Sequence, residues 1–184
     1  MSLAKSELTK EKIILGAASV IRKNGIQSCT HRAVAEEAGV SLGTTTYQFR
    51  TLDELIVAVM KYTIDDFTDK TRGWLNLNFS GKKEEILTRF VFWTLSERSR
   101  LRSEYELFVA AVSRPALRPC AIQWLHVHEE LLMEYLALTP AQARAAVSCI
   151  DAWLMRGILD ETEAILSEKM ILTVFQAIVK NPQA

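Results

Sequence analysis

The segment Thr30–Phe49 constrains the fold of this 184-residue chain more than any other part of its sequence. Gly39 lies near its middle, where a residue that readily adopts left-handed dihedrals permits a tight turn. Thr30 and Ser41 each stand just before a short run with helical spacing, and both residue types favour the N-cap position of a helix. The segment therefore predicts two short helices joined by a tight turn.

The rest of the chain has the same helical periodicity. Apolar side chains recur at intervals of three and four residues, alternating strand-like runs are few, and the chain has only 7 Gly and 4 Pro. We therefore expect an all-α protein. The expected helices cover residues 9–24, 30–39, 41–50, 52–75, 83–100, 102–113, 116–138 and 140–159, with a last helix from Thr162 or Glu163 to Lys180.

These helices indicate two domains. Residues 1–51 are expected to form a three-helix head, and residues 52–184 a helical body that begins with a long helix. No linker rich in Gly or Ser separates the two, and a continuous helix transmits movement better than a flexible linker does. We therefore expect the head and the body to be mechanically coupled.

Hydropathy and charge narrow the class of protein. No uncharged apolar run approaches the ~20 residues of a membrane span, and the first residues form no signal segment, so we expect a cytoplasmic protein with no membrane partner. Three widely spaced cysteines suit reduced thiols in that compartment. The net charge is zero, but residues 1–50 hold seven Lys and Arg against four Glu. A slightly basic end on an acidic remainder can approach phosphate groups.

The second short helix carries side chains with which proteins contact DNA. In a helix-turn-helix this helix enters the major groove, while the first helix crosses the backbone. Hydroxyls and helix N-terminal amides bind phosphate, glutamine pairs with adenine, and glycine permits close approach of the backbone. We therefore predict contacts with double-stranded DNA at Thr30, His31, Ser41, Leu42, Gly43, Thr44, Thr46, Tyr47 and Gln48. The alternative interpretation is an ordinary helical hairpin with exposed threonines.

These residues resemble the TetR family of transcriptional regulators. The resemblance implies a homodimer that binds a near-palindromic operator, usually represses transcription, and is released by a small molecule bound in the C-terminal part. It covers about 50 residues, through the motifs Ile21-Arg22-Lys23-Asn24-Gly25, Thr30-x-x-x-Val34-Ala35-x-x-Ala38-Gly39-Val40-Ser41-x-Gly43-Thr44, Tyr47-x-Phe49 and Leu52-Asp53-Glu54-Leu55.

Two positions depart from the family pattern. Positions 42 and 52 are often lysine in the family, and here they are Leu42 and Leu52. Two possible phosphate contacts are therefore missing, which argues against tight DNA binding at high salt. The departure also motivates an alternative function, a helical ligand-binding or adaptor protein that has lost DNA binding.

The expected body contains the candidate ligand site. It holds all four tryptophans, and aromatic side chains around an apolar cavity suit an apolar or aromatic small-molecule effector. By the resemblance, helices of the body enclose this site. For any single aromatic residue, a role in an ordinary core is the alternative. The candidate ligand-binding residues are Trp93, Tyr105, Phe108, Trp124, His128 and Trp153.

The sequence shows no arrangement typical of catalysis, of a metal site or of a cofactor site. His126 and His128 are two residues apart on an expected helix, so their side chains point about 200° apart and do not share one metal. No nucleophile-base pair, phosphate loop or Cys/His cluster is present. We therefore expect neither enzymatic activity nor a cofactor, and an all-α enzyme is the weakest alternative.

The last two expected helices have more apolar surface than one core interface needs. This surplus predicts a four-helix interface with a second copy of the chain. The alternative is that the last helix covers only its own subunit. The candidate interface residues are Ala145, Cys149, Ala152, Arg156, Ile171 and Phe175.

We therefore predict a homodimeric DNA-binding transcriptional regulator of the TetR type, for which the resemblance implies repression. Its two recognition helices should enter major grooves about one helical turn apart, roughly 34 Å or slightly more. A small, largely apolar or aromatic ligand should release it from a palindromic operator by tilting the helix 52–75.

Overall fold

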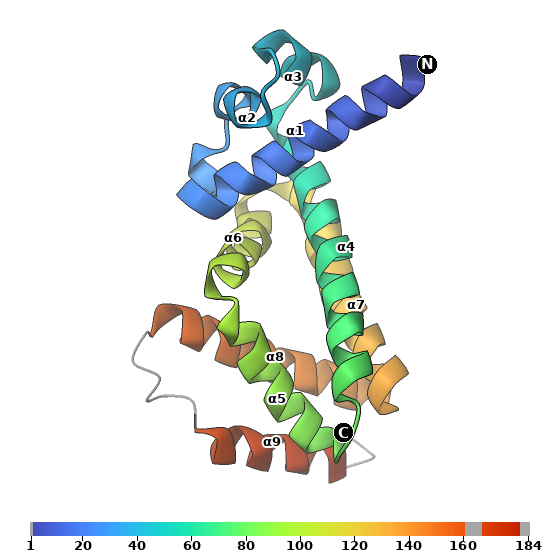
Figure 1. Ribbon diagram of the computed structural model, residues 1–184. Helices are drawn as coiled ribbons and strands as arrows, with labels where there is room; N and C mark the ends of the chain where they lie inside the picture. Colours follow the sequence, from blue (N-terminus) through green and yellow to red (C-terminus); the bar gives the residue numbers. More distant parts are fainter. Residues whose placement is uncertain (1, 161–166, 181–184) are drawn as a thin grey trace. The chain divides into compact units, whose positions relative to one another are not determined.

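A computed structural model describes residues 2–160 and 167–180, and every regular element in these ranges is helical (Figure 1). The all-α prediction is therefore confirmed. No helix of the described residues is long and apolar enough to span a lipid bilayer. The elements are α1 (Ser2–Asn24), η1 (Ile26–Ser28), α2 (His31–Ala38), α3 (Leu42–Gln48), α4 (Leu52–Asn78), α5 (Lys83–Ser96), α6 (Arg98–Ser113), η2 (Pro115–Leu117), α7 (Arg118–Leu136), α8 (Pro140–Leu159) and α9 (Glu168–Lys180), where η marks a short 3-10 helix.

α1 begins at Ser2, earlier than the start expected at Thr9. Thr9, at the expected start, lies inside the helix, where its hydroxyl donates to the carbonyl oxygen of Lys5 at 2.8 Å. The helix ends at Asn24, as expected, and Gly25 follows with a φ of 81°. The apolar spacing thus located the helix and its end, but not its first residue.

The tight turn between α2 and α3 forms where the sequence predicts it. The Thr30 hydroxyl accepts a hydrogen bond from the amide of Ala33 at 3.1 Å, and the Ser41 hydroxyl accepts one from the amide of Thr44 at 3.0 Å. Gly39 ends α2 in the left-handed conformation, with φ 64° and ψ 36°. Because each helix is capped at its start and the turn suits glycine, the two helices form at lengths of only 8 and 7 residues.

The boundary between α5 and α6 differs from the prediction. One expected helix ended at Arg100 and the next began at Arg102, but α5 ends at Ser96 and α6 begins at Arg98. Glu97 leaves the helical conformation, with φ −99° and ψ 45°, and the Ser96 hydroxyl donates to the carbonyl of the preceding turn. No Gly or Pro lies at this break, and the helical periodicity of the sequence continues through it, so the sequence did not indicate its position.

α8 begins at Pro140, the start expected from the sequence, directly after a capping residue. The Thr139 hydroxyl accepts from the amide of Gln142, and the Gln142 side chain accepts from the amide of Thr139, with Pro140 at the first helical position. α9 is described from Glu168 onward. The start expected for it at 162 or 163 lies outside the described residues.

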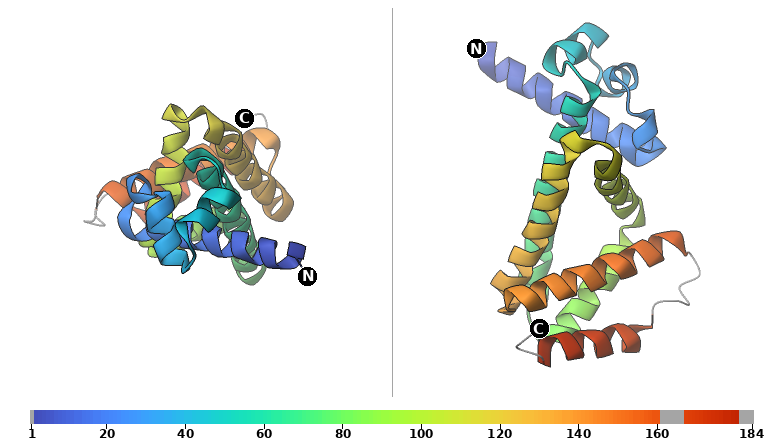
Figure 2. Two further views of the ribbon diagram at one scale, coloured as in Figure 1. Left: turned by 90° about the horizontal axis from the view of Figure 1, so that it is seen from above. Right: turned by 180° about the vertical axis from the view of Figure 1, so that it is seen from behind.

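The chain divides into two compact units, here called unit 1 and unit 2. Unit 1 comprises residues 1–66 and 102–122, and unit 2 comprises residues 67–101 and 123–184. In unit 1, α2 packs against α1 and α3; in unit 2, α5 packs against α8 and α9 (Figures 1 and 2). Unit 1 thus contains the expected head together with parts of α4, α6 and α7.

Candidate functional site

α3 has one buried side and one exposed side. Thr45 is fully buried, and Phe49, directly after the helix, is 4% exposed, so this side anchors α3 in unit 1. On the other side, Tyr47 is 82% exposed and Leu42 is 50% exposed. Large apolar and aromatic groups left exposed together are typical of an interaction surface.

The hydroxyl groups of the exposed side form hydrogen bonds within their own helix. The hydroxyls of Ser41 and Thr44 are 2.8 Å apart, and the Thr46 hydroxyl donates to the carbonyl oxygen of Leu42 at 3.1 Å. Ser41, Gly43 and Thr46 are exposed, whereas Thr44 is half-buried. This side therefore offers methyl groups and an aromatic ring, with hydroxyls already oriented by the helix.

Three of the predicted contact residues lie away from this exposed side or are already engaged. Gln48 is half-buried and donates through Nε2 to the hydroxyl of Ser6 in α1 at 3.1 Å, so pairing with a base requires that bond to break. Thr30 is exposed and caps α2. His31 is half-buried, and its Nδ1 atom is buried with no hydrogen-bond partner.

Two glycines of unit 1 have opposite structural roles. A Cβ placed at Gly16 in α1 would lie 2.8 Å from the Cβ of Ala38, so the close packing of α1 on α2 requires glycine there. A Cβ at Gly43 in α3 would meet only the Ser41 hydroxyl, at 3.8 Å. Among the residues that the structure describes, no packing contact therefore requires glycine at position 43.

Polar contacts within unit 1 join α6 and its following turn to the head. The Glu106 carboxylate accepts a hydrogen bond from the amide of Ile26, at the first residue of η1, at 2.9 Å. Arg114 pairs with Asp53, at the start of α4, with 3.2 Å between Nη1 and Oδ1. These contacts hold η1, inside the head, and the start of α4, which directly follows the head.

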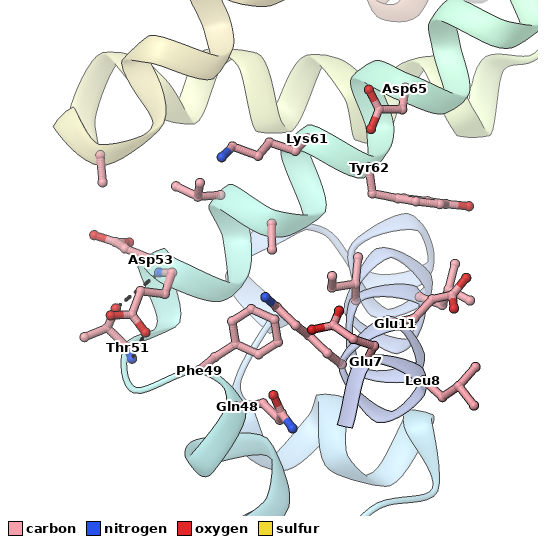
Figure 3. Close-up of a pocket in the computed structure, with 17 residues that line it drawn as sticks. Glu7, Leu8, Glu11, Gln48, Phe49, Thr51, Asp53, Lys61, Tyr62 and Asp65 are labelled. Carbon is pink, nitrogen blue, oxygen red and sulfur yellow. Dashed lines mark hydrogen bonds between the residues drawn. The ribbon is translucent and has the colours of Figure 1, made fainter. Parts of the chain in front are cut away.

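A wide groove of about 1180 Å³ lies between α1 and the first turns of α4 (Figure 3). Two of its carboxylates have a structural role, since Asp53 pairs with Arg114 and Glu54 accepts from the amide of Arg50 at 2.8 Å. Phe49 and Tyr62 supply aromatic surface. The charged residues that line the groove are Glu7, Lys10, Glu11, Asp53, Glu54, Lys61 and Asp65.

Unit 2 contains a cluster of three aromatic rings from α4 and α5. Trp74 and Trp93 are stacked with centroids 5.3 Å apart, and Phe90 lies 5.5 Å from each of them. The guanidinium carbon of Arg100 lies 5.8 Å from the centroid of Trp93. Phe90 is 2% exposed and connects this cluster to the interior of the unit.

A second aromatic cluster surrounds a buried histidine. Phe67 of α4 stacks on Trp124 of α7 with centroids 5.5 Å apart, and contacts the ring of His128 edge-on at 4.1 Å. Burial lowers the pKa of His128 to about 3, so its imidazole is neutral at pH 7. A neutral imidazole has one donor and one acceptor nitrogen.

A small closed cavity of about 10 Å³ lies beside His128. Thr71 of α4 also lines it. Both ring nitrogens of His128 and the hydroxyl of Thr71 are buried and have no hydrogen-bond partner among residues 2–160 and 167–180. The other walls are apolar and come from α5, α7 and α8: Phe90, Leu131, Leu132, Val147 and Ile150.

The six predicted ligand-binding residues do not form one cluster. Trp124 and His128 meet around Phe67, and Trp93 belongs to the neighbouring ring cluster that contains Phe90. Trp153 instead contacts Phe175 of α9, at 5.1 Å between centroids. Tyr105 and Phe108 pair with each other at 6.5 Å and belong to unit 1.

The predicted interface residues also differ in exposure. Ala152 and Arg156 of α8 are exposed, and Ala145 and Cys149 are half-buried. Ile171 and Phe175 of α9 are 0% exposed, so these two side chains hold α9 in its own unit and offer no surface to a second copy. Exposed apolar side chains nearby in sequence are Leu159 and Met170.

Sequence reasoning missed Thr71 and Phe67. Both lie on the stripe of α4 whose apolar members Ile64, Phe67 and Leu75 are buried, with spacings of three and four residues. A threonine on an otherwise apolar stripe is the signal that could have identified Thr71. Which residue faces it from another helix was not visible in the sequence.

Comparisons with known proteins agree with this architecture. The family profile "Tetracyclin repressor-like, C-terminal domain" matches residues 84–180. The multidrug binding protein EbrR, solved in complex with ethidium, is 32% identical, with a TM-score of 0.82 over 94% of this chain and 99% of that one. A TetR family member from Streptomyces coelicolor A3, SCO1917, is 31% identical, with a TM-score of 0.77 over 94% and 99% of the two chains.

A curated relative matches over a shorter stretch. The HTH-type transcriptional regulator PksA of Bacillus subtilis (strain 168) is 33% identical over 66 residues, which span 36% of this chain and only 32% of PksA. The family profile and the similarity to EbrR each cover more than half of the chain. The chain therefore belongs to the TetR family of transcriptional regulators.

Proposed function

We propose that this regulator binds a near-palindromic operator as a cytoplasmic homodimer and represses transcription until a small ligand releases it. The observation that carries the DNA-binding part is the exposure of Tyr47, at 82%, on a helix whose opposite side is buried. The ring has no packing role inside the chain that explains its size, whereas a base edge or a sugar-phosphate backbone provides a partner for it.

The exposed side of α3 has the chemistry of a major-groove surface. Leu42 and the methyl group of Thr46 can pack against thymine methyl groups, and the hydroxyl of Tyr47 can contact phosphate or a base edge. Gly43 allows the backbone of the helix to approach the duplex. Because these contacts include few charges, the proposed specificity depends on shape and methyl contacts more than on salt links.

The proposed effector is a small, largely apolar or aromatic molecule bound in unit 2. Two aromatic clusters and an internal cavity support this location. The relative EbrR has been solved with imidazole, ethidium, proflavin and malachite green, all of which contain aromatic rings. We extend the aromatic ring that these ligands share to the effector of the present chain.

The proposed dimer forms through α8 and α9, which present exposed Ala152, Arg156, Leu159 and Met170. Two recognition helices related by a twofold axis then reach half-sites roughly 34 Å apart or slightly more. Sedimentation of the purified protein tests this part directly, since a monomer at micromolar concentration contradicts it.

The proposed signal travels along α4. This helix is unbroken from Leu52, directly after the head, to Asn78, and it carries Thr71 at the cavity. A ligand that moves side chains around Thr71 would tilt α4 and misalign the two heads. A helix-breaking change near the middle, Tyr62→Pro, should abolish release by the ligand; a variant that folds and is still released contradicts this route.

The first experiment is selection of bound sequences from a random pool of DNA duplexes at low salt. We expect an enriched palindrome, and a Tyr47→Ala variant should lose at least tenfold in affinity for it. A folded dimer that enriches no sequence would instead support the adaptor alternative.

A glycine pair sharpens the test. Gly43→Ala adds a methyl group that fits the free protein, so the variant should fold with unchanged or slightly raised stability, yet lose operator affinity tenfold or more. The matched control is Gly73→Ala in α4, where a Cβ meets nothing within 4 Å. If Gly43→Ala binds the operator as tightly as Gly73→Ala does, the backbone of α3 does not approach the duplex closely.

A further inference from the structure

The cavity of unit 2 is lined by buried polar groups that have no hydrogen-bond partner among the described residues. Buried hydroxyls and ring nitrogens normally have a hydrogen-bond partner, because leaving one without a partner destabilises the folded protein. Thr71 is 1% exposed and His128 is 7% exposed, and the Thr71 hydroxyl and both His128 nitrogens are buried without a partner. Both residues line the same cavity.

The other buried threonines show that this is specific to Thr71. Thr88 and Thr94 donate to the carbonyl oxygen four residues earlier, at 2.8 and 2.9 Å, and Thr45 does so at 3.4 Å. In the described chain, the hydroxyl of Thr71 makes no such bond. Its hydroxyl therefore remains available to a group that enters the cavity.

The size and walls of the cavity define that group. A volume of about 10 Å³ is close to the space of one water-sized group. The remaining lining residues are apolar, and none of the seven carries a carboxylate, a guanidinium or an ammonium group. The cavity therefore suits one uncharged hydroxyl or amino group and offers no counterion to a charge.

We propose that Thr71 and His128 form the polar end of the effector site and bind the hydroxyl or amino group of an uncharged aromatic ligand. This inference rests on the proposed function, which places the effector in unit 2. The acceptor nitrogen of His128 takes the ligand's O–H or N–H, and the Thr71 hydroxyl rotates to donate to the ligand's heteroatom.

The ring of such a ligand is larger than the cavity, so binding requires the surrounding side chains to move. Phe67 contacts His128, and Phe90 belongs to the neighbouring ring cluster. These two side chains are the aromatic groups next to the ring of the entering ligand. Binding thus selects an opened arrangement of the residues around α4. The same requirement connects ligand recognition to movement of the helix that carries Thr71.

The test uses a matched pair of neutral probes, 2-naphthol and 2-methoxynaphthalene, which differ in whether the oxygen carries hydrogen or methyl. Calorimetric titration of the full-length protein should show at least tenfold tighter binding of 2-naphthol. His128→Leu should weaken 2-naphthol binding at least fivefold and change binding of the methyl ether less than twofold, because only 2-naphthol donates to His128. Thr71→Val should weaken 2-naphthol binding at least fivefold, and it should also weaken binding of the methyl ether, whose oxygen accepts from the same hydroxyl. Equal affinities for the two probes, or no saturable binding of 2-naphthol, would overturn the proposal.

Thermal unfolding without ligand distinguishes this site from a structural water site. Valine has nearly the same shape as threonine and lacks its hydroxyl, so Thr71→Val should unfold at an unchanged or higher temperature. A clearly lower unfolding temperature would mean that the hydroxyl has a structural partner, and would overturn the proposal.

An operator-release assay separates failure of this inference from failure of the proposed function. Suppose that the protein binds the selected operator and that 2-naphthol releases the wild type and Thr71→Val at the same concentration. The proposed effector function is then supported, and the assignment of Thr71 to the effector site is wrong. If 2-naphthol binds wild type in the predicted way but no duplex is enriched, the polar end stands and the DNA-binding function is wrong.

Discussion

The two hollows of this protein differ in almost every physical property. The groove of unit 1 is large, about 1180 Å³, and its walls carry five carboxylates and two lysines. The cavity of unit 2 is small, about 10 Å³, and its two polar residues lie among apolar side chains. By size alone, the groove is the better candidate for a ligand site.

The chemistry favours the small cavity instead. The charged groups of the groove are exposed to water or have a partner, as Asp53 has in Arg114. The free protein is therefore not destabilised when the groove is empty. Thr71 and His128 are buried and have no hydrogen-bond partner in the described chain. A ligand that bonds to them therefore forms hydrogen bonds that the free protein lacks. We therefore propose the cavity rather than the groove as the recognition site, on the ground of its unsatisfied buried groups and against its smaller volume.

The largest expected difference is in stability. Phe90 lines the cavity and is 2% exposed, so Phe90→Ala should lower the free energy of unfolding by about 3–5 kcal/mol. Tyr62 lines the groove and is half-buried, so Tyr62→Ala should lower it by less than about 1 kcal/mol. Urea unfolding followed by circular dichroism measures both. Similar losses would mean that the groove is as tightly packed as the cavity.

The second prediction concerns pH. Because burial lowers the pKa of His128 from 6.5 to about 3, the unfolded chain binds a proton that the folded protein excludes between these values. The stability present above pH 6.5 is therefore lost as pH falls, by about 2 kcal/mol at pH 5.

Urea unfolding at pH 7 and at pH 5 tests this loss. His128→Phe should remove it, whereas His126→Gln, at an exposed position of the same helix, should retain it. A pH dependence that is identical in His128→Phe and the wild type would show that other groups cause the acid sensitivity.

A smaller effect is expected at the rim of the groove. The side chains of Asp53 and Arg114 are 49% and 27% exposed, so their ion pair is screened by solvent. Asp53→Asn should lower the free energy of unfolding by at most about 1 kcal/mol, and less at high salt. A loss above about 2 kcal/mol, measured by urea unfolding in low and high salt, would make the groove a structural site rather than an open surface.

The smallest effect is expected inside the groove. Glu7 and Glu11 are exposed, so Glu7→Gln combined with Glu11→Gln should change the free energy of unfolding by no more than about 0.5 kcal/mol. Calorimetric titration should also show the same affinity for 2-naphthol within twofold. Loss of 2-naphthol binding in this double variant would move the ligand site from the cavity to the groove.

The sequence by itself determined the parts of the fold that depend on neighbouring residues. The caps at Thr30, Ser41 and Thr139 bond to amides three residues away, and Gly39 takes its left-handed conformation locally. These interactions form within one helical turn, so their residue types predict them. The same local information did not locate the helix break at Glu97, because no residue type there signals the end of a helix. The predicted break lay several residues later, between Arg100 and Arg102.

Only the tertiary structure decided which distant side chains meet. The bond from the amide of Ile26 to Glu106 joins residues 80 apart, and Ile171 and Phe175, expected on a surface, are wholly buried. The sequence singled out His128 but not Thr71, and it grouped Trp153 with residues from which the structure separates it. Whether a buried polar group has a partner depends on everything packed around it, and helical spacing along one chain segment contains no record of that packing.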